Sequence, residues 1–269
     1  MDFLQSAFLG AVEGITEFLP VSSTGHLILI SHVLGIASTE FVKSFEIAIQ
    51  LGAIFAVVLL YWRKLFIERG VLARVVVAFV PTAVLGFFFY PFIKAYLLGN
   101  VSVVLWALFL GGVFLIVFEF WYSKKLSRLP VGGQTTFNFQ LSTSLSDVTI
   151  RQAAIIGLCQ SVSMIPGVSR AAATIVGGML VGLSREAVVE FSFLLAIPTM
   201  TAATGLDLFK TSAVFSGNEW LLLAVGFISA FIFALLAVKF LLSFIKHHTF
   251  IGFGIYRICA AALFFLFLF

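Results

Sequence analysis

The sequence predicts an all-α polytopic membrane protein, with about six transmembrane helices and two re-entrant helical hairpins in an inverted-topology repeat. The 269-residue chain is 61% hydrophobic and 10% charged, and its mean hydropathy is +1.16. Soluble domains carry about 25% charged residues. The apolar runs are long and do not alternate as strands do, which favours helices over a barrel. Helix-breaking residues recur about 146 residues apart, at Pro20 and Pro166.

The chain begins with two helical segments that are too short to span a membrane. Residues 1–18 favour a helix, which Pro20 ends because proline lacks an amide donor and clashes with the preceding turn. Ser22 or Ser23 can then cap a second short helix at about residues 24–34. A span needs roughly 20 residues, so we expect a re-entrant hairpin here.

A polar linker at residues 123–149 separates this half of the chain from a second half with the same pattern. A short helix from about Ile150 reaches a break at Pro166 and Gly167, and another short helix ends near Gly182. Three full-length apolar segments follow the short helices in each half, at about residues 41–62, 71–94 and 101–122, and at about residues 187–208, 219–241 and 249–269.

The two halves form a repeat within a single membrane domain, residues 1–122 and residues 150–269. Residues 10–13 align with residues 157–160, so that Gln160 takes the place of Glu13, and the two prolines also align. A hairpin that enters and leaves through one face gives each half three crossings. The second half is then inverted, and the two hairpins meet near the midplane of the membrane.

The distribution of Lys and Arg predicts which side each hairpin faces. The positive-inside rule places the more basic loops in the cytoplasm. With this topology the linker is cytoplasmic, both termini are outside, and the first hairpin opens to the extracytoplasmic face. One face receives eleven basic residues and the other three: Arg63, Lys64, Arg69, Arg74, Lys124, Lys125, Arg128, Arg151, Arg185, Lys239 and Lys246, against Lys43, Lys94 and Lys210.

Residues 13–26, which read EGITEFLPVSSTGH, are the most unusual part of so apolar a chain. Glu13 and Glu17 are four residues apart and share a helix face. Two close carboxylates in an apolar setting hold either a proton or a cation, and oxygen ligands suit Mg²⁺ or Ca²⁺. The alternative is that they cap a helix or pair with basic residues. Ionisable groups at membrane depth are costly, which favours a functional role.

Three further side chains of this stretch are candidates for chemistry. Ser22 and Ser23 lie at the chain break, where their hydroxyls can face a ligand or simply cap a helix. His26 lies three residues after Ser23, a spacing that permits a serine–histidine contact. In that contact His26 acts as a base or as a proton donor to a leaving group. A nucleophilic His26 stays open.

The corresponding stretch of the second half, PGVSRAAAT, carries Gly167, Ser169, Arg170 and Thr174. We expect Ser169 to cap the following helix. The exposed amides of that helix and the Arg170 guanidinium form an anion site suited to phosphate. Arg170 could instead neutralise an acid of the first hairpin, and the two roles are compatible. Arg257, inside the last span, reaches the interface or lines the bundle.

These groups suit hydrolysis of a phosphoryl ester or anhydride on a substrate with a long apolar tail. The main alternative is a polyprenyl-phosphate transporter or flippase, because opposed hairpins in an inverted repeat are transporter architecture. An ion channel is disfavoured, since the polar residues cluster at two breaks and do not line a span.

At these motifs the chain resembles the undecaprenyl-diphosphate phosphatase family, also called bacitracin-resistance proteins. The resemblance covers essentially the whole chain, and it rests on EGITE at residues 13–17, FLPVSSTGH at residues 18–26 and PGVSRAAAT at residues 166–174. One position departs from the family pattern. Ala171 stands where the family usually has serine, so that hydroxyl is not essential in this chain.

The resemblance implies an enzyme that removes the terminal phosphate of C55 undecaprenyl diphosphate. The product is the lipid carrier for peptidoglycan synthesis, and the activity confers resistance to bacitracin, which sequesters the same diphosphate. The implied location is the bacterial plasma (inner) membrane, with the active site facing the exterior. The expected partners are the polyprenyl diphosphate lipid and the bilayer, with a homodimer left open and no nucleic acid.

The resemblance also assigns site residues. It implies Ser23 as the attacking hydroxyl, His26 in proton transfer and Arg170 gripping the diphosphate, with the nucleophile open among Ser23, His26 and water. Glu13 and Glu17 would hold a divalent cation, Mg²⁺ or Ca²⁺, or position His26. The implied substrate-binding residues are Ser22, Gln160, Gly167, Ser169, Arg170 and Thr174.

Overall fold

A computed structural model describes residues 1–97, 100–127, 144–211 and 215–268, and these ranges are helical without a β-strand. Six helical segments in them are long and apolar enough to cross a membrane, which confirms the prediction of an all-α polytopic membrane protein. The six candidate spans are Glu40–Phe66, Arg69–Phe89, Val101–Lys125, Arg185–Asp207, Gly217–Phe244 and Ile251–Leu268.

Within the described ranges the first half contains six α-helices and the second half five. The helices of the first half are α1 (Phe3–Thr16), α2 (Ser23–Val33), α3 (Glu40–Ala48), α4 (Gln50–Phe66), α5 (Arg69–Phe92) and α6 (Val101–Ser127). Those of the second half are α7 (Ile150–Ser161), α8 (Arg170–Leu180), α9 (Arg185–Thr211), α10 (Gly217–Phe244) and α11 (Ile251–Leu268).

The linker begins later than the sequence predicts. Residues 123–127 belong to the last turns of α6, where Lys124 and Lys125 interact favourably with the negative end of the helix dipole. Residues 128–143 of the predicted linker lie outside the described residues. The described remainder is a 3₁₀ turn at Leu145–Asp147, followed by Thr149, whose hydroxyl caps α7.

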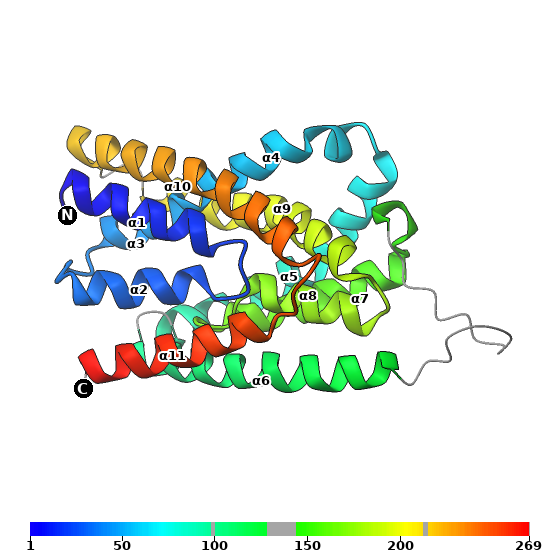
Figure 1. Ribbon diagram of the computed structural model, residues 1–269. Coiled ribbons are helices and arrows are strands. Elements are labelled where there is room, and N and C mark those ends of the chain that lie inside the picture. The colour runs from blue at the N-terminus through cyan, green and yellow to red at the C-terminus, as the bar shows by residue number, and fades with distance from the viewer. Residues whose placement is uncertain (98–99, 128–143, 212–214, 269) are drawn as a thin grey trace, which may run out of the picture.

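The first short helix of each half packs against a span of the opposite half. The helix α1 lies along α10, α7 lies along α5, and α6 lies along α11. Figure 1 shows α1 and α2 extending from the end that carries both termini, whereas α7 and α8 lie toward the end where α6 finishes. This reciprocal packing is the pattern that an inverted repeat predicts. The re-entrant path of the two short-helix pairs stays a prediction.

Close packing of the short helices depends on glycine at matching positions of the two halves. A Cβ atom at Gly10 would lie 2.3 Å from the carbonyl oxygen of Gly226 on α10. One at Gly157 would lie 2.0 Å from the carbonyl oxygen of Ala78 on α5. In a membrane, small residues let helix backbones approach closely. The two glycines that align in the sequence therefore have the same packing role.

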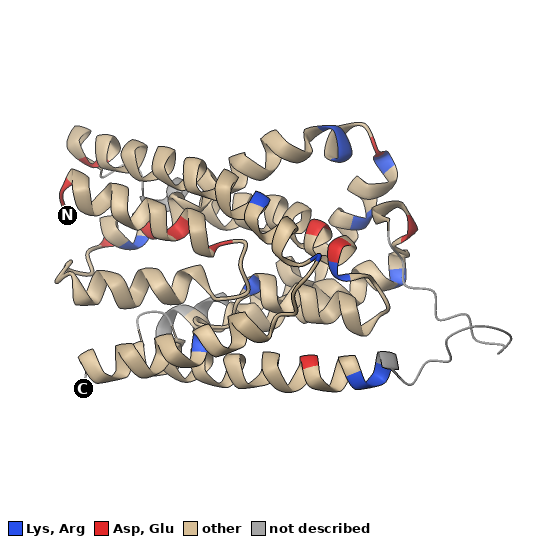
Figure 2. Cartoon of the chain, in the orientation of Figure 1, with Lys and Arg blue, Asp and Glu red and all other residues tan. Residues whose placement is uncertain are grey.

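Charge is concentrated at one end of the bundle. Figure 2 shows Lys and Arg gathered where α4 meets α5 and where α6 ends, opposite the two termini. Two ion pairs also join α9 to its neighbours: Lys64 with Glu190 at 2.6 Å, and Arg185 with the fully buried Glu119 at 2.6 Å. The bundle therefore has a strongly basic end and a weakly charged end that carries both termini.

Candidate active site

The break between α1 and α2 is held in an unusual backbone conformation. Ser22 precedes α2 with φ of 73°, in the left-handed region that side chains other than glycine seldom adopt. Its hydroxyl makes no capping hydrogen bond, so the predicted serine cap of α2 is wrong. Conformations of this kind cost on the order of 1–3 kcal/mol and cluster at functional sites.

The break between α7 and α8 is unstrained by comparison. Gly167 takes the left-handed conformation there, with φ of 92°, which glycine adopts freely. The predicted cap of the following helix is confirmed, because the Ser169 hydroxyl accepts a hydrogen bond of 3.1 Å from the amide of Ala172. The Ser169 hydroxyl also donates to the carbonyl oxygen of Leu19 at 3.5 Å, so the two breaks touch.

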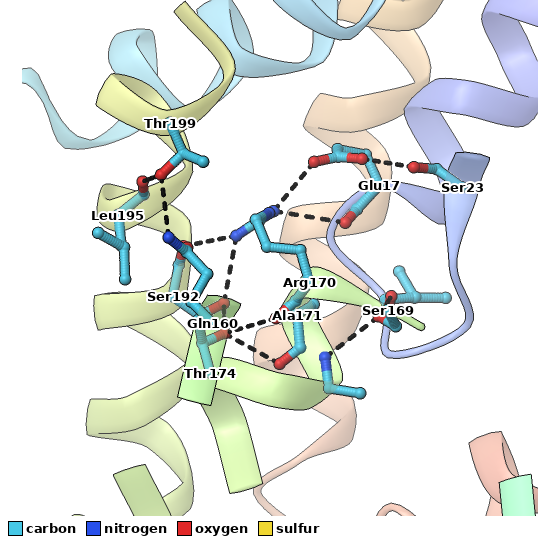
Figure 3. Close-up of polar contacts among 12 residues, drawn as sticks. Glu17, Ser23, Gln160, Ser169, Arg170, Ala171, Thr174, Ser192, Leu195 and Thr199 are labelled. Carbon is cyan, nitrogen blue, oxygen red and sulfur yellow. Dashed lines mark hydrogen bonds and ion pairs between the residues drawn. The ribbon is translucent and has the colours of Figure 1, made fainter. Parts of the chain in front are cut away.

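The Glu17 carboxylate joins the two breaks (Figure 3). One of its oxygens accepts a 2.5 Å hydrogen bond from the Ser23 hydroxyl. The other forms an ion pair of 3.1 Å with the Arg170 guanidinium. These two side chains come from opposite halves of the chain, and all three are at least 93% buried. The proposed neutralisation of a first-hairpin acid by Arg170 is therefore present, with Glu17 as its partner.

Arg170 is also anchored on the side away from Glu17 (Figure 3). Its Nη1 donates to the carbonyl oxygen of Ser192 at 2.8 Å and lies 3.4 Å from the Ser192 hydroxyl. The Ser192 hydroxyl is 2.6 Å from that of Thr174, whose oxygen also donates to backbone carbonyls of α8. Thr174 therefore supports Arg170 through Ser192, while the Nε of Arg170 has no partner.

Glu13 and Gln160, the aligned pair of the repeat, are both fully buried. Neither carboxylate oxygen of Glu13 has a hydrogen-bond partner, and the Gln160 side-chain oxygen also lacks one. Burial, together with the neighbouring Glu17 carboxylate, raises the pKa of Glu13 well above its usual value. Buried unpaired polar atoms are costly, so these oxygens are available for a proton, a cation or a substrate.

His26 does not contact Ser23, so the serine–histidine contact that the spacing permits is not formed. The Nδ1 atom lies 2.8 Å from the carbonyl oxygen of Ser22, and Nε2 lies 2.9 Å from the hydroxyl of Tyr256. A carbonyl only accepts, so Nδ1 carries the hydrogen and Nε2 of the neutral ring accepts from Tyr256. Burial lowers the pKa of His26, which favours this neutral form.

Sequence reasoning missed the partners that the spans supply. Ser192, Tyr256 and two threonines, Thr82 and Thr199, lie in spans far from the motifs. Gln160 donates to both threonine hydroxyls, at 2.8 and 3.2 Å. Each threonine directly follows a proline inside an apolar span, and that proline–threonine pair was a signal in the sequence. Tyr256 and Ser192 carry no comparable local signal.

Glu13 and Glu17 offer carboxylate oxygens that suit a divalent cation such as Mg²⁺. Glu13 offers two unpartnered oxygens beside Glu17, whose oxygens are already bound to Ser23 and Arg170. Within the described ranges no group of three or more His, Cys, Asp or Glu side chains converges as a metal cage. Mg²⁺ is usually held by one or two carboxylates together with substrate phosphates and water, so two acids suffice.

Comparison with known proteins identifies the family. The family model described as bacitracin resistance protein BacA matches residues 6–263. The chain belongs to this family. Among curated members, the undecaprenyl-diphosphatase of Aquifex aeolicus is 50% identical over 266 residues, covering 98% of each chain. That of a Sulfurihydrogenibium species is 47% identical over 99% of each chain. That of Thermus thermophilus is 46% identical over 97% of this chain and 95% of its own. The resemblance seen in the motifs is thus confirmed over nearly the whole chain.

Proposed function

We propose that this protein hydrolyses undecaprenyl diphosphate to undecaprenyl phosphate and inorganic phosphate. The observation that carries the proposal is the Glu17 carboxylate, which binds a hydroxyl of one break and a guanidinium of the other. A base, a nucleophile and an anion-binding group therefore meet at one point. The names of the curated relatives support the same substrate.

The contacts of Ser23 suggest the first chemical step. Its hydroxyl oxygen attacks the terminal phosphorus, and its proton passes to the Glu17 oxygen 2.5 Å away. The bond from that phosphorus to the bridging oxygen breaks, and undecaprenyl phosphate leaves. Arg170 exchanges Glu17 for the phosphoryl oxygens and stabilises their charge, as guanidinium groups do in phosphoryl transfer. The product of this step is a phosphoserine at position 23.

The second step regenerates the serine. Water attacks the phosphorus, the bond to the Ser23 oxygen breaks, Glu17 returns its proton to that oxygen, and inorganic phosphate leaves. His26 takes a proton from the water through Nε2, the ring nitrogen that Tyr256 contacts. A divalent cation held by Glu13 and Glu17 would neutralise charge on the transferred phosphoryl group. Ser22, Gln160, Gly167, Ser169 and Thr174 complete the binding site in this proposal.

The charge distribution supports an outward-facing site in the bacterial inner membrane. The basic end of the bundle suits the cytoplasm, which leaves both termini, and the end from which α1 and α2 extend, toward the exterior. A site on that side would recycle the lipid carrier after peptidoglycan assembly and would confer bacitracin resistance, in keeping with the family description.

A polyprenyl-phosphate transporter remains the second candidate, on the observation that the first short helix of each half packs against a span of the opposite half. A transporter needs Arg170 and the acids, but it has no need for a serine hydroxyl bound to a carboxylate. The two functions differ in whether phosphate is released.

Phosphate release by the purified protein in detergent or nanodiscs tests the proposal directly. Undecaprenyl diphosphate should yield inorganic phosphate, and a phosphorylated peptide containing residue 23 should be trapped by rapid acid quenching. Movement of lipid phosphate across vesicles without phosphate release would instead support the transporter.

A further inference from the structure

Arg257 is the most deeply buried basic side chain among the described residues, with 1% of its surface exposed, and it lies inside the span α11. Among the described residues, no carboxylate forms an ion pair with Arg257. All its hydrogen bonds go to backbone carbonyls. A buried guanidinium in a span is costly and calls for a specific role.

The carbonyls that Arg257 binds belong to three segments. Its Nη1 donates to Pro20 at 3.3 Å, in the break between α1 and α2, and Nη2 donates to Gly167 at 3.0 Å, in the break between α7 and α8. Nη2 also donates to Ala107 at 2.9 Å, and Nε donates to Leu108 at 3.3 Å, both on α6. One planar group thus binds both breaks and a span.

Chain breaks leave carbonyls that a continuous helix would satisfy, and at membrane depth water does not replace those bonds. Arg257 satisfies one such carbonyl at each break with the same group. Pro20 lies three residues before Ser23, and Gly167 lies three residues before Arg170. The guanidinium therefore binds a carbonyl three residues before the proposed nucleophile and another three residues before the phosphate-binding arginine.

We infer that Arg257 is a positioning residue that holds the two breaks in register, so that Ser23 and Glu17 face Arg170. This role rests on the proposed hydrolysis, because register matters where a nucleophile and an anion-binding group must meet. A misplacement of 1 Å costs about 100-fold in rate. The anchorage of Arg170 on Ser192 does not involve Arg257, so substrate binding depends less on it.

Two substitutions at position 257 separate position from charge. Arg257→Gln and Arg257→Lys should both lower kcat by about 100-fold, with KM within about 3-fold of that of the unmodified protein. Lysine keeps the positive charge, but its single ammonium cannot bind three segments at once. Activity restored by Lys, or a raised KM with unchanged kcat, would overturn the positioning role.

Neighbouring glycines of α6 provide a matched pair of variants that keep the arginine. A Cβ at Gly111 would lie 2.1 Å from Nη2 of Arg257, so Gly111→Ala pushes the guanidinium from its place. A Cβ at Gly112 would instead lie 2.7 Å from the carbonyl oxygen of Gly254 on α11 and 3.1 Å from the Cβ of Arg257, so it crowds the base of that side chain and not its guanidinium. Gly111→Ala should lower kcat at least 10-fold more than Gly112→Ala. Equal losses would show a general packing effect and would contradict the inference.

Amide hydrogen exchange tests the same role without substrate. In Arg257→Gln, exchange should rise at residues 18–24 and 165–171 and stay unchanged along α6 and α11. Unchanged exchange at both breaks, or a rise throughout the bundle, would overturn the inference. If the unmodified protein releases no phosphate, the proposed function fails, while this exchange pattern still decides whether Arg257 holds the breaks together.

Discussion

Two serines stand three residues after the two repeat-related prolines, and only one of them contacts a carboxylate. The Ser23 hydroxyl donates to Glu17 at 2.5 Å, whereas the Ser169 hydroxyl accepts the capping amide of α8. In the proposed mechanism, the same residue type at matching positions gives up a proton in the first half, which we call the chemical half, and caps a helix in the second half, which we call the binding half. The contact partner differs between the two serines, whereas the residue type does not.

The backbone conformation at the break also differs between the two halves. The left-handed conformation falls on Gly167 in the binding half, where it costs little, and on Ser22 in the chemical half, where it is strained. The strained turn places the Ser22 carbonyl 2.8 Å from Nδ1 of His26 and so fixes the tautomer of the ring. The strained residue therefore lies next to the group that acts as a base in the proposed mechanism.

Among the groups around Ser23, Glu17 should be the most sensitive to substitution. Glu17→Gln should lower kcat by about 1,000-fold, because an amide cannot take the Ser23 proton and leaves Arg170 without its counter-charge. Phosphate release measures the loss. Glu190→Gln is a matched control, since Glu190 pairs with Lys64 and not with Ser23 or Arg170, and it should stay within about 3-fold. Retention of a tenth of the activity in Glu17→Gln would contradict the role of the base.

His26 should be the next most sensitive position. His26→Ala should lower phosphate release by at least 100-fold while the protein remains folded, because the proton acceptor of the second step is lost. Far-ultraviolet circular dichroism and thermal unfolding check the fold. Unchanged turnover in this variant would remove His26 from the mechanism.

Tyr256→Phe should have a smaller effect of about 10-fold, with a change in pH dependence. Burial keeps His26 neutral below its usual pKa of about 6.5, so the acid limb of the rate profile should lie below that value. The hydrogen bond from the tyrosine hydroxyl favours the neutral ring, so its loss should move the acid limb to higher pH. The change is measured from a profile of kcat/KM between about pH 4 and about pH 9. An acid limb that does not move would contradict the assigned tautomer.

Divalent cations should contribute about 10-fold or more. A chelator should lower phosphate release by the unmodified protein, and added Mg²⁺ or Ca²⁺ should restore it. Glu13→Gln should weaken the apparent cation affinity, because the substitution removes a carboxylate whose two oxygens have no hydrogen-bond partner. Full activity in excess chelator would show that Glu13 holds a proton instead.

Two substitutions of Ser22 should have the smallest effect, and they distinguish backbone strain from a role of the hydroxyl. Ser22→Gly and Ser22→Ala lack the same hydroxyl, so their kinetic parameters should agree within about 3-fold. Glycine adopts φ of 73° freely, so Ser22→Gly should be more stable than Ser22→Ala by about 1 kcal/mol. Thermal unfolding measures the difference. Equal stability of the two variants would show that the turn is not strained.

The helices and the two breaks were predictable from sequence because their causes are local. Apolar length fixes the spans, and Pro20 and Gly167 interrupt the chain where the structure does. The meeting of Glu17 with Arg170 followed from the repeat. His26 was assigned to the wrong partner because a spacing of three residues indicates proximity along α2 but not the direction of the ring. Tyr256, 230 residues away, decides that direction.

Arg257 shows the same limit more strongly. An arginine in an apolar span has two ordinary explanations from sequence, reaching the interface or lining the bundle. Its actual acceptors are backbone carbonyls of three distant segments, and no residue type in the sequence marks a carbonyl that lacks a partner. Such a site becomes visible only when the two breaks are placed together in space.

The comparison of Ser23→Ala with Ser169→Ala tests the central claim most directly. With undecaprenyl diphosphate as substrate, Ser23→Ala should lower kcat by at least about 1,000-fold with little loss of stability. Ser169→Ala should lose about 1 kcal/mol of stability through the missing cap but keep kcat within about 10-fold. Equal losses of kcat in the two variants, or turnover by Ser23→Ala near that of the unmodified protein, would contradict the division into a chemical half and a binding half.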